Sequence, residues 1–219
     1  GRFELPPTPL GMLGEHQAAN AALALATIIE LRHQGWLVSS EAMRLGLARH
    51  SLPARVEVFC RSPTVNLDVA HNVAAAEALG EVLRSHFPHE ERTLLLAATR
   101  EKDVAGIVRV LLPHFKHVVV TEYVENPRAV PTARLAEIVE KERLRLDGTK
   151  TTRQLDQEPD PKRAWQMVQA TLHRESLACV TGSFFIAAEL RRVLLATCGE
   201  DSDPGHEPDG PRQVPGSNL

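Results

Sequence analysis

The sequence predicts an α/β fold with a Rossmann-like, mostly parallel sheet that has helices on both faces. First, short apolar runs alternate with helical segments after Pro53, an order typical of parallel sheets. Second, two of these segments, Thr93–Ala98 and Lys116–Thr121, contain the apolar runs L-L-L-A-A and H-V-V-V, which suit central strands covered on both faces. Third, in T-V-N-L-D-V-A-H-N-V-A-A-A-E-A-L at Thr64–Leu79, an apolar strand leads directly into an alanine-rich helix.

Two helices are expected before this region. The segment Gly14–His33 is rich in Ala and Leu, which favours a helix. It is apolar nearly all round, so we expect it to be buried. Prolines at positions 6, 7 and 9 exclude a helix before it. A second helix follows Ser39 or Ser40, either of which can cap it, and runs to about Ala48.

The α/β region divides into expected strands and helices by the same patterns. Strands are expected at Arg55–Cys60, Val65–Asp68, Thr93–Ala98, Lys116–Thr121 and Leu177–Thr181. Helices are expected at Asn72–His86, Asp103–Leu112, Pro131–Lys141, Pro161–His173 and Ser183–Leu195. After Cys198 acidic residues, Pro and Gly dominate, so residues 199–219 are expected to form a disordered tail.

Composition limits the partners of the chain. Its 219 residues include 25 basic and 28 acidic side chains, a net charge of −3, which gives no electrostatic support for binding nucleic acid. No apolar run is long enough to span a membrane, and the N-terminus has no signal-peptide pattern. Three cysteines without a C-x-x-C pair speak against a disulfide framework or a zinc site. Cys60 and Cys179 are expected to be buried thiols, and the protein is expected to be cytoplasmic.

The stretch around Asp68 predicts a ligand site. Ligands of open parallel sheets bind beyond the carboxyl ends of the strands, and Asp68 stands at such an end. The helix that starts near Asn72 directs its free N–H groups into the same space. Asp68 could accept hydrogen bonds from a ribose diol, while His71 and Asn72 contact phosphate or substrate groups. Alternatively, Asp68 or Asn72 only caps the helix, and the residues alone leave both interpretations open.

Several sequence words resemble the folylpolyglutamate synthase/dihydrofolate synthase branch of the Mur ligase superfamily. They are H-Q-A-A-N-A-A-L-A-L, L-P-A-R-V-E-V, N-L-D-V-A-H-N-V-A-A-A-E-A-L, T-R-E-K-D-V-A-G-I, N-P-R-A-V-P and V-T-G-S-F-F-I-A-A-E-L-R. They occur in the family's order and cover roughly residues 5–195. The resemblance implies that residues 53–198 form the Mur ligase C-terminal α/β domain, and that residues 1–52 hold the terminal helices of the central ATPase domain.

The resemblance implies an ATP-dependent ligase. Such enzymes use ATP and Mg²⁺ to activate a carboxylate as an acyl phosphate, which the amino group of L-glutamate then attacks. The acceptor is dihydropteroate or a reduced folate, and the full-length enzyme is expected to be a monomer. No G-x-x-x-x-G-K-S/T phosphate loop occurs in the sequence. We therefore expect no metal ligands here, Mg²⁺ ligands mainly in an upstream part, and little or no activity of this chain alone.

The resemblance also gives roles to single residues. Asn20 matches the asparagine on the adenine side of ATP, Arg55 the arginine that reaches ATP, and Asp68 the aspartate that holds the ribose. Arginine can bind phosphate through two parallel hydrogen bonds, which suits this role. His71 matches the histidine of the same loop, near the phosphates or the incoming glutamate, and is the candidate catalytic residue.

Further candidates for substrate binding are Asn72, Lys102 and Ser183. Lys102 and Asp103 match a Lys-Asp pair of the family. Asp103 is more simply explained as a helix N-cap. Ser183 follows Gly182 at another strand-to-helix turn on the ligand edge, and it too could be a cap.

Two positions depart from the family pattern. Val69 stands where the family loop D-G-A-H-N has glycine, and Ala54 replaces the glycine that usually precedes Arg55. A β-branched residue disfavours a positive φ, so we expect extended backbone at Val69.

Two other functions remain open. One is a Mur-type ligase that adds an amino acid to a cell-wall precursor, although the T-G-S-F-F-I segment fits the folate branch better. The other is a catalytically inactive nucleotide-binding or interaction domain. The sequence has no G-x-G-x-x-G turn after its first strand, which argues against a dinucleotide ligand.

Overall fold

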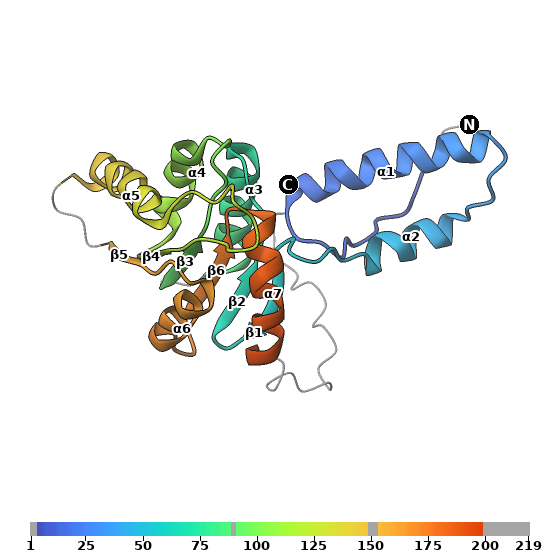
Figure 1. Cartoon of the computed structure of the whole chain (residues 1–219). Coiled ribbons are helices and arrows are strands. Elements are labelled where there is room, and N and C mark those ends of the chain that lie inside the picture. Colours follow the sequence, from blue (N-terminus) through green and yellow to red (C-terminus); the bar gives the residue numbers. More distant parts are fainter. Residues whose placement is uncertain (1–3, 89–90, 149–152, 199–219) are drawn as a thin grey trace, which may run out of the picture.

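The computed structural model describes residues 4–88, 91–148 and 153–198, and the tail expected from residue 199 lies outside them. Two helices extend away from an α/β domain (Figure 1). The helices are α1 (Glu15–His33), α2 (Ser40–Arg49), α3 (Val73–His86), α4 (Val104–Leu111), α5 (Thr132–Asp147), α6 (Pro161–Thr171) and α7 (Phe184–Cys198). The strands are β1 (Glu57–Arg61), β2 (Thr64–Leu67), β3 (Arg92–Leu96), β4 (His117–Val120), β5 (Gln154–Gln157) and β6 (Leu177–Thr181).

The strands form one sheet in the order β1-β2-β6-β3-β4-β5. β1 runs antiparallel to β2, and all other neighbouring strands are parallel. The predicted mostly parallel α/β sheet is therefore confirmed. The last strand, β6, lies between β2 and β3, so the turns that follow these three strands meet at one edge of the sheet.

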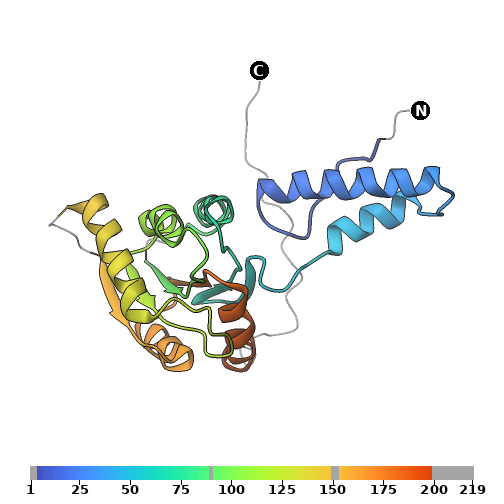
Figure 2. The ribbon, with the colours of Figure 1, turned by 45° about the horizontal axis from the view of Figure 1, so that its top comes forward.

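Helices cover both faces of the sheet. α3, α4 and α5 lie on one face, and α6 and α7 lie on the other (Figures 1 and 2). Neighbouring side chains of a strand point to opposite faces: Leu94 and Leu96 belong to the core under α3, α4 and α5, and Leu95 to the core under α6 and α7. Burial on both sides explains the uninterrupted apolar stretches L-L-L of β3 and V-V-V of β4.

The edge strand β5 is missing from the sequence-based prediction. Its sequence Q-L-D-Q holds one apolar residue, Leu155, and so gives no strand signal. β5 pairs with β4 alone, and Asp156 on it contacts His117 of β4, with 2.8 Å between Oδ2 and Nε2. Polar side chains suit an edge strand because they discourage pairing with another chain.

The prediction that Gly14–His33 is buried is wrong for the described chain. Gln17 is the one buried residue of α1, and Leu23 is 69% exposed. α1 lies beside α2 (Figure 2), and the described residues cover only part of its surface. Trp36 and Leu37, which follow α1, are exposed as well. No helix within the described ranges is long and apolar enough to cross a bilayer.

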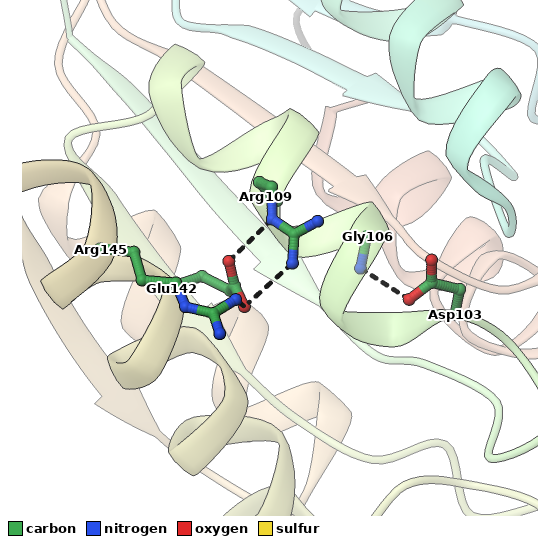
Figure 3. Close-up of polar contacts among 5 residues, drawn as sticks. All are labelled: Asp103, Gly106, Arg109, Glu142 and Arg145. Carbon is green, nitrogen blue, oxygen red and sulfur yellow. Dashed lines mark hydrogen bonds and ion pairs between the residues drawn. The ribbon is translucent and has the colours of Figure 1, made fainter.

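A nearly buried carboxylate joins α4 to α5 (Figure 3). Glu142 on α5 accepts hydrogen bonds from Arg109 Nε of α4, at 2.9 Å, and from Arg145 Nη1, at 2.8 Å. The hydrogen bond from Arg109 lowers the pKa of Glu142, and burial opposes this effect. A carboxyl with a lowered pKa stabilises the folded state above its unfolded pKa of 4.5, and this contribution is lost as the pH falls through the folded value.

The Glu142→Gln variant is expected to be less stable than the wild type near pH 7, and the difference should shrink as the pH falls below 4.5. Glutamine keeps the shape of the side chain but cannot pair with Arg109 as a charge. Urea unfolding curves at several pH values measure the difference. A stability difference that stays constant over this range would contradict the expectation.

A disulfide joins Cys60 of β1 to Cys198, the last residue of α7, and their Cα atoms are 5.6 Å apart. The expectation of a buried thiol at Cys60 is therefore wrong. The two cysteines are 138 residues apart in sequence, and only the packing of α7 beside β1 brings them together. Cys179 is buried and free, as predicted.

The Cys198→Ser variant is expected to lose up to about 4 kcal/mol of unfolding free energy without reductant, because the disulfide constrains a long loop of the unfolded chain. Thermal unfolding with and without dithiothreitol measures this effect. Reductant should destabilise the wild type and leave the variant unchanged. Equal effects of reductant on both proteins would contradict the presence of the bond.

Candidate functional site

Asp68 lies at the carboxyl end of β2 and connects two loops. Its Oδ1 accepts a hydrogen bond from Ala70 N at 2.7 Å, and its Oδ2 accepts one from Val56 N at 3.0 Å. The residue is 7% exposed. Burial raises the pKa of this carboxyl, while the two N–H groups and nearby Arg55 act in the opposite direction. Asp68 therefore fixes the start of β1 against the loop that leads to α3.

Arg55 sits between two residues with unusual backbone geometry. Ala54 has φ 55° and Val56 has φ 50°, and these are the non-glycine residues with positive φ in the described chain. Val69 does not have a positive φ, in agreement with the expectation for a β-branched residue. The guanidinium carbon of Arg55 lies 5.8 Å from the centre of the Phe184 ring, a cation–π distance.

His71 contacts the same aromatic ring. Its imidazole centre is 5.0 Å from that of Phe184. Nδ1 lies 2.8 Å from the carbonyl oxygen of Val69, and because a carbonyl can only accept, Nδ1 carries the proton and donates. Nε2 is then the nitrogen left for a ligand. Arg55 and His71 thus both contact Phe184, which is 51% exposed, and Asp68 holds the backbone next to each of them.

Asn72 and Ser183 use their side-chain oxygens within the fold. Asn72 is the N-cap of α3, and its Oδ1 accepts a hydrogen bond from Ala75 N at 2.8 Å. Ser183 is buried, its Oγ accepts from Phe185 N at 3.2 Å, and it lies 3.3 Å from Thr99 Oγ1. The cap interpretation is therefore confirmed for Asn72, whose amide nitrogen remains available. The hydroxyl of Ser183 faces the interior.

Asn20 on α1 is linked to the site through two neighbours. Its Nδ2 donates to Gln17 Oε1 at 3.1 Å, and Gln17 Nε2 lies 3.0 Å from His16 Nε2. His16 is in turn one of the electrostatic neighbours of Asp68. Asn20 also borders a cavity of about 310 Å³. The cavity is lined by Leu10, Met12, Gln17, Asn20, Ala21, Ala24, Leu47, His50 and Leu52.

Lys102 lies apart from this group, at a second cavity of about 400 Å³ near the start of α4 and α5. Arg100 and Arg134 also line it, together with Asp103 and several apolar residues, so its charged side chains are mainly cationic. Asp103 beside Lys102 caps α4, with Oδ1 accepting from Gly106 N at 2.8 Å (Figure 3). The N-cap explanation of Asp103 is confirmed.

The sequence did not single out Phe184, His16 or Glu57. Phe184 follows Ser183 directly. Its position next to a strand-to-helix turn is the one local signal that could have indicated a role in the site. His16 belongs to the word H-Q-A-A-N but carried no separate prediction. Glu57, whose carboxylate accepts a hydrogen bond from Ala54 N beside Arg55, has the sequence context of an ordinary surface strand residue. Within the described ranges, no group of three or more His, Cys, Asp or Glu side chains could hold a metal ion.

Comparisons with known proteins show the family to which this domain belongs. Residues 54–184 match the family described as Mur ligase, glutamate ligase domain. The dihydrofolate synthase/folylpolyglutamate synthase of Mycobacterium tuberculosis is 38% identical over 148 residues, 67% of this chain and 30% of that protein. The chain thus spans less than half the length of this relative.

Two solved structures are similar over most of the chain. Mycobacterium tuberculosis folylpolyglutamate synthase complexed with ADP and AMPPCP matches with a TM-score of 0.75 and 29% identity, over 94% of this chain and 43% of that one. The bifunctional folylpolyglutamate synthase/dihydrofolate synthase of Yersinia pestis, complexed with AMPPNP and Mn ion, matches with a TM-score of 0.71 and 28% identity, over 89% of this chain and 42% of that one. The predicted resemblance is confirmed, and the chain belongs to the Mur ligase family as a partial chain that holds its C-terminal, glutamate ligase domain.

Proposed function

We propose that this chain is the C-terminal part of an ATP-dependent ligase that joins L-glutamate to dihydropteroate, a reduced folate or both. The observation that carries the proposal is that Arg55 and His71 both contact Phe184 at the carboxyl ends of the strands, and that the buried Asp68 holds the backbone next to each of them. A cation, a buried carboxylate and an imidazole at this edge are suited to bind the phosphates and the ribose of a nucleotide. The related solved structures are complexed with ADP, AMPPCP or AMPPNP, which supports this assignment.

Each residue is proposed to bind a different part of ATP. Asp68 retains unused lone pairs beside its two backbone partners, and these would accept hydrogen bonds from the ribose hydroxyls. Arg55 would bind phosphate oxygens through its planar donors. Asn20 borders an apolar cavity of about 310 Å³, at the small end of the range for ligand pockets, where we place the adenine.

Substrate-binding roles are also proposed for His71 and for Lys102, at separate places. Nε2 of His71 is free to contact a phosphate oxygen or the amino group, and Lys102 lies at a cavity that Arg100 and Arg134 make cationic. In the reaction, ATP transfers its terminal phosphate to the acceptor carboxylate and leaves as ADP. The amino group of glutamate then forms the amide bond and displaces phosphate.

The rest of the active site is proposed to lie in an upstream part. The exposed apolar residues of the α1–α2 region, Leu23, Trp36 and Leu37, would pack against it, with residues 1–52 belonging to the ATPase domain. The Mg²⁺ ligands are proposed to be there, since Mn ion accompanies the nucleotide in a related structure. Without that part we expect little or no catalysis, and we expect a monomeric, cytoplasmic protein when the enzyme is complete.

Titration of ADP into the chain, followed by NMR, tests the nucleotide assignment. We expect shift changes at residues 55, 68–72 and 184. Arg55→Ala is expected to weaken ADP binding about tenfold or more, because a hydrogen bond to a charged group contributes about 1.5–3 kcal/mol. Arg44→Ala is the matched control: Arg44 is paired with Glu41 on α2, and its loss should leave ADP binding unchanged. Shift changes elsewhere, or no binding at millimolar ADP, would favour an interaction domain instead.

A further inference from the structure

One stripe of α7 contacts the segment that contains Arg55 and β1. Phe184, Arg191 and Cys198 are seven residues apart and therefore lie on the same face of the helix. Phe184 contacts Arg55, Arg191 pairs with Glu57, and Cys198 is bonded to Cys60. The three partners follow one another in the same order along the chain, so α7 runs alongside this segment.

Glu57 lies at the centre of these contacts. Its carboxylate accepts hydrogen bonds from Arg191, with Nε at 2.9 Å from Oε2 and Nη2 at 2.7 Å from Oε1. Oε2 also accepts from Ala54 N at 2.7 Å. Partial burial acts to raise the pKa of Glu57, but the hydrogen bonds from Arg191 and Ala54 and the charge of Arg191 together lower it, so the carboxylate stays charged. Glu57 thus connects α7 to the backbone just before Arg55.

The backbone around Arg55 needs such support. Ala54 and Val56 adopt positive φ, a region that disfavours residues with a Cβ atom. Each is held by a carboxylate, because Glu57 accepts the N–H of Ala54 and Asp68 accepts the N–H of Val56. Arg55 is therefore held from both sides, and the ring of Phe184 fixes its guanidinium.

We infer that Glu57 and Arg191 are positioning residues that hold Arg55 in the orientation in which it binds the phosphates of the nucleotide. The inference rests on the proposed function for its ligand. Neither residue contacts the nucleotide in this arrangement: Arg191 acts through Glu57, and Glu57 acts through the N–H of Ala54. With alanine at position 54, the carboxylate stabilises a backbone conformation that glycine would adopt without a Cβ penalty.

The test compares variants of the chain by NMR, with isotope labels on arginine side chains. In the wild type, the side-chain protons of Arg55 should be shifted by the Phe184 ring. Glu57→Gln is expected to move them toward the values of an unstructured arginine and to weaken ADP binding about fivefold. Arg191→Gln removes the other partner of the same ion pair and should change the Arg55 resonances and ADP binding in the same direction. It serves as the test if Glu57→Gln folds poorly.

Two further variants separate positioning from general stability. Adding Ala54→Gly to Glu57→Gln should restore at least half of the Arg55 shift, because glycine tolerates the positive φ. Glu142→Gln breaks a comparable ion pair between α4 and α5, and it should leave both Arg55 and ADP binding unchanged.

The outcomes are distinct. Unchanged Arg55 resonances in Glu57→Gln and Arg191→Gln, or no restoration by glycine at position 54, would overturn the positioning role. The same would follow if Glu142→Gln moved Arg55 as much as Glu57→Gln does. If the wild type fails to bind ADP, the proposed function fails, while the Arg55 resonances still decide whether Glu57 and Arg191 position this side chain.

Discussion

Gly182→Ala is expected to destabilise the fold by about 3–5 kcal/mol, through backbone strain and a steric clash together. Gly182 has φ +107°, which side chains rarely allow, and an added Cβ would lie 2.3 Å from the carbonyl oxygen of Ala97. That oxygen belongs to the backbone at the end of β3 and cannot move without disturbing the sheet. The turn that carries Ser183 and Phe184 would be displaced with it.

Urea unfolding measures the effect, and Gly46→Ala is its control. Gly46 lies inside α2, where an added Cβ meets no atom within 4 Å. Alanine there should stabilise the protein by about 0.5–1 kcal/mol, because glycine is a poor helix residue. A loss at Gly182 no larger than about 1 kcal/mol would contradict the described turn.

Asp68→Ala is expected to lower the unfolding free energy by about 2–4 kcal/mol and to abolish measurable ADP binding. The change leaves the buried N–H groups of Val56 and Ala70 without an acceptor, at about 1–3 kcal/mol each. Removal of a carboxylate that burial disfavours offsets part of this loss. The ribose would also lose its proposed partner.

The pH dependence of the Asp68→Ala effect has a definite sign. Burial raises the folded pKa of Asp68 above its unfolded value of 3.8. The contribution of this group to stability is therefore fully present below 3.8 and decreases as the pH rises through the folded value. The stability difference between wild type and variant should be larger near pH 4 than near pH 7. Urea unfolding at both pH values checks this, and a larger difference near pH 7 would contradict it.

The sequence predicts the parts of the site that depend on local signals. Asp68 could be placed because a strand ends where a helix begins, and Asn72 and Asp103 could be identified as caps from residue type and position. The burial of β3 and β4 on both faces could be predicted from their apolar runs. In each case the information lies within a few neighbouring residues.

The remaining features depend on contacts between distant segments. Glu57 and Arg191 are 134 residues apart, and nothing near either residue indicates the other. A β-branched residue such as Val56 disfavours a positive φ, so its sequence does not predict the observed conformation, which the hydrogen bond from its N–H to Asp68 helps to hold. The exposure of α1 also differs from the prediction. The apolar composition of a helix indicates that it packs against other residues, but it does not indicate whether the described chain contains those residues.

Glutamate transfer by the complete ligase tests the central proposal most directly. The polypeptide that joins this chain to its upstream reading frame would receive ATP, Mg²⁺ and labelled L-glutamate, with dihydropteroate and tetrahydrofolate offered separately. The Mycobacterium tuberculosis relative serves as the positive control. We expect label in at least one product, and a large loss of label in the Arg55→Ala variant. No label with either acceptor, under conditions in which the relative is active, would contradict the assignment to glutamate ligation of folates.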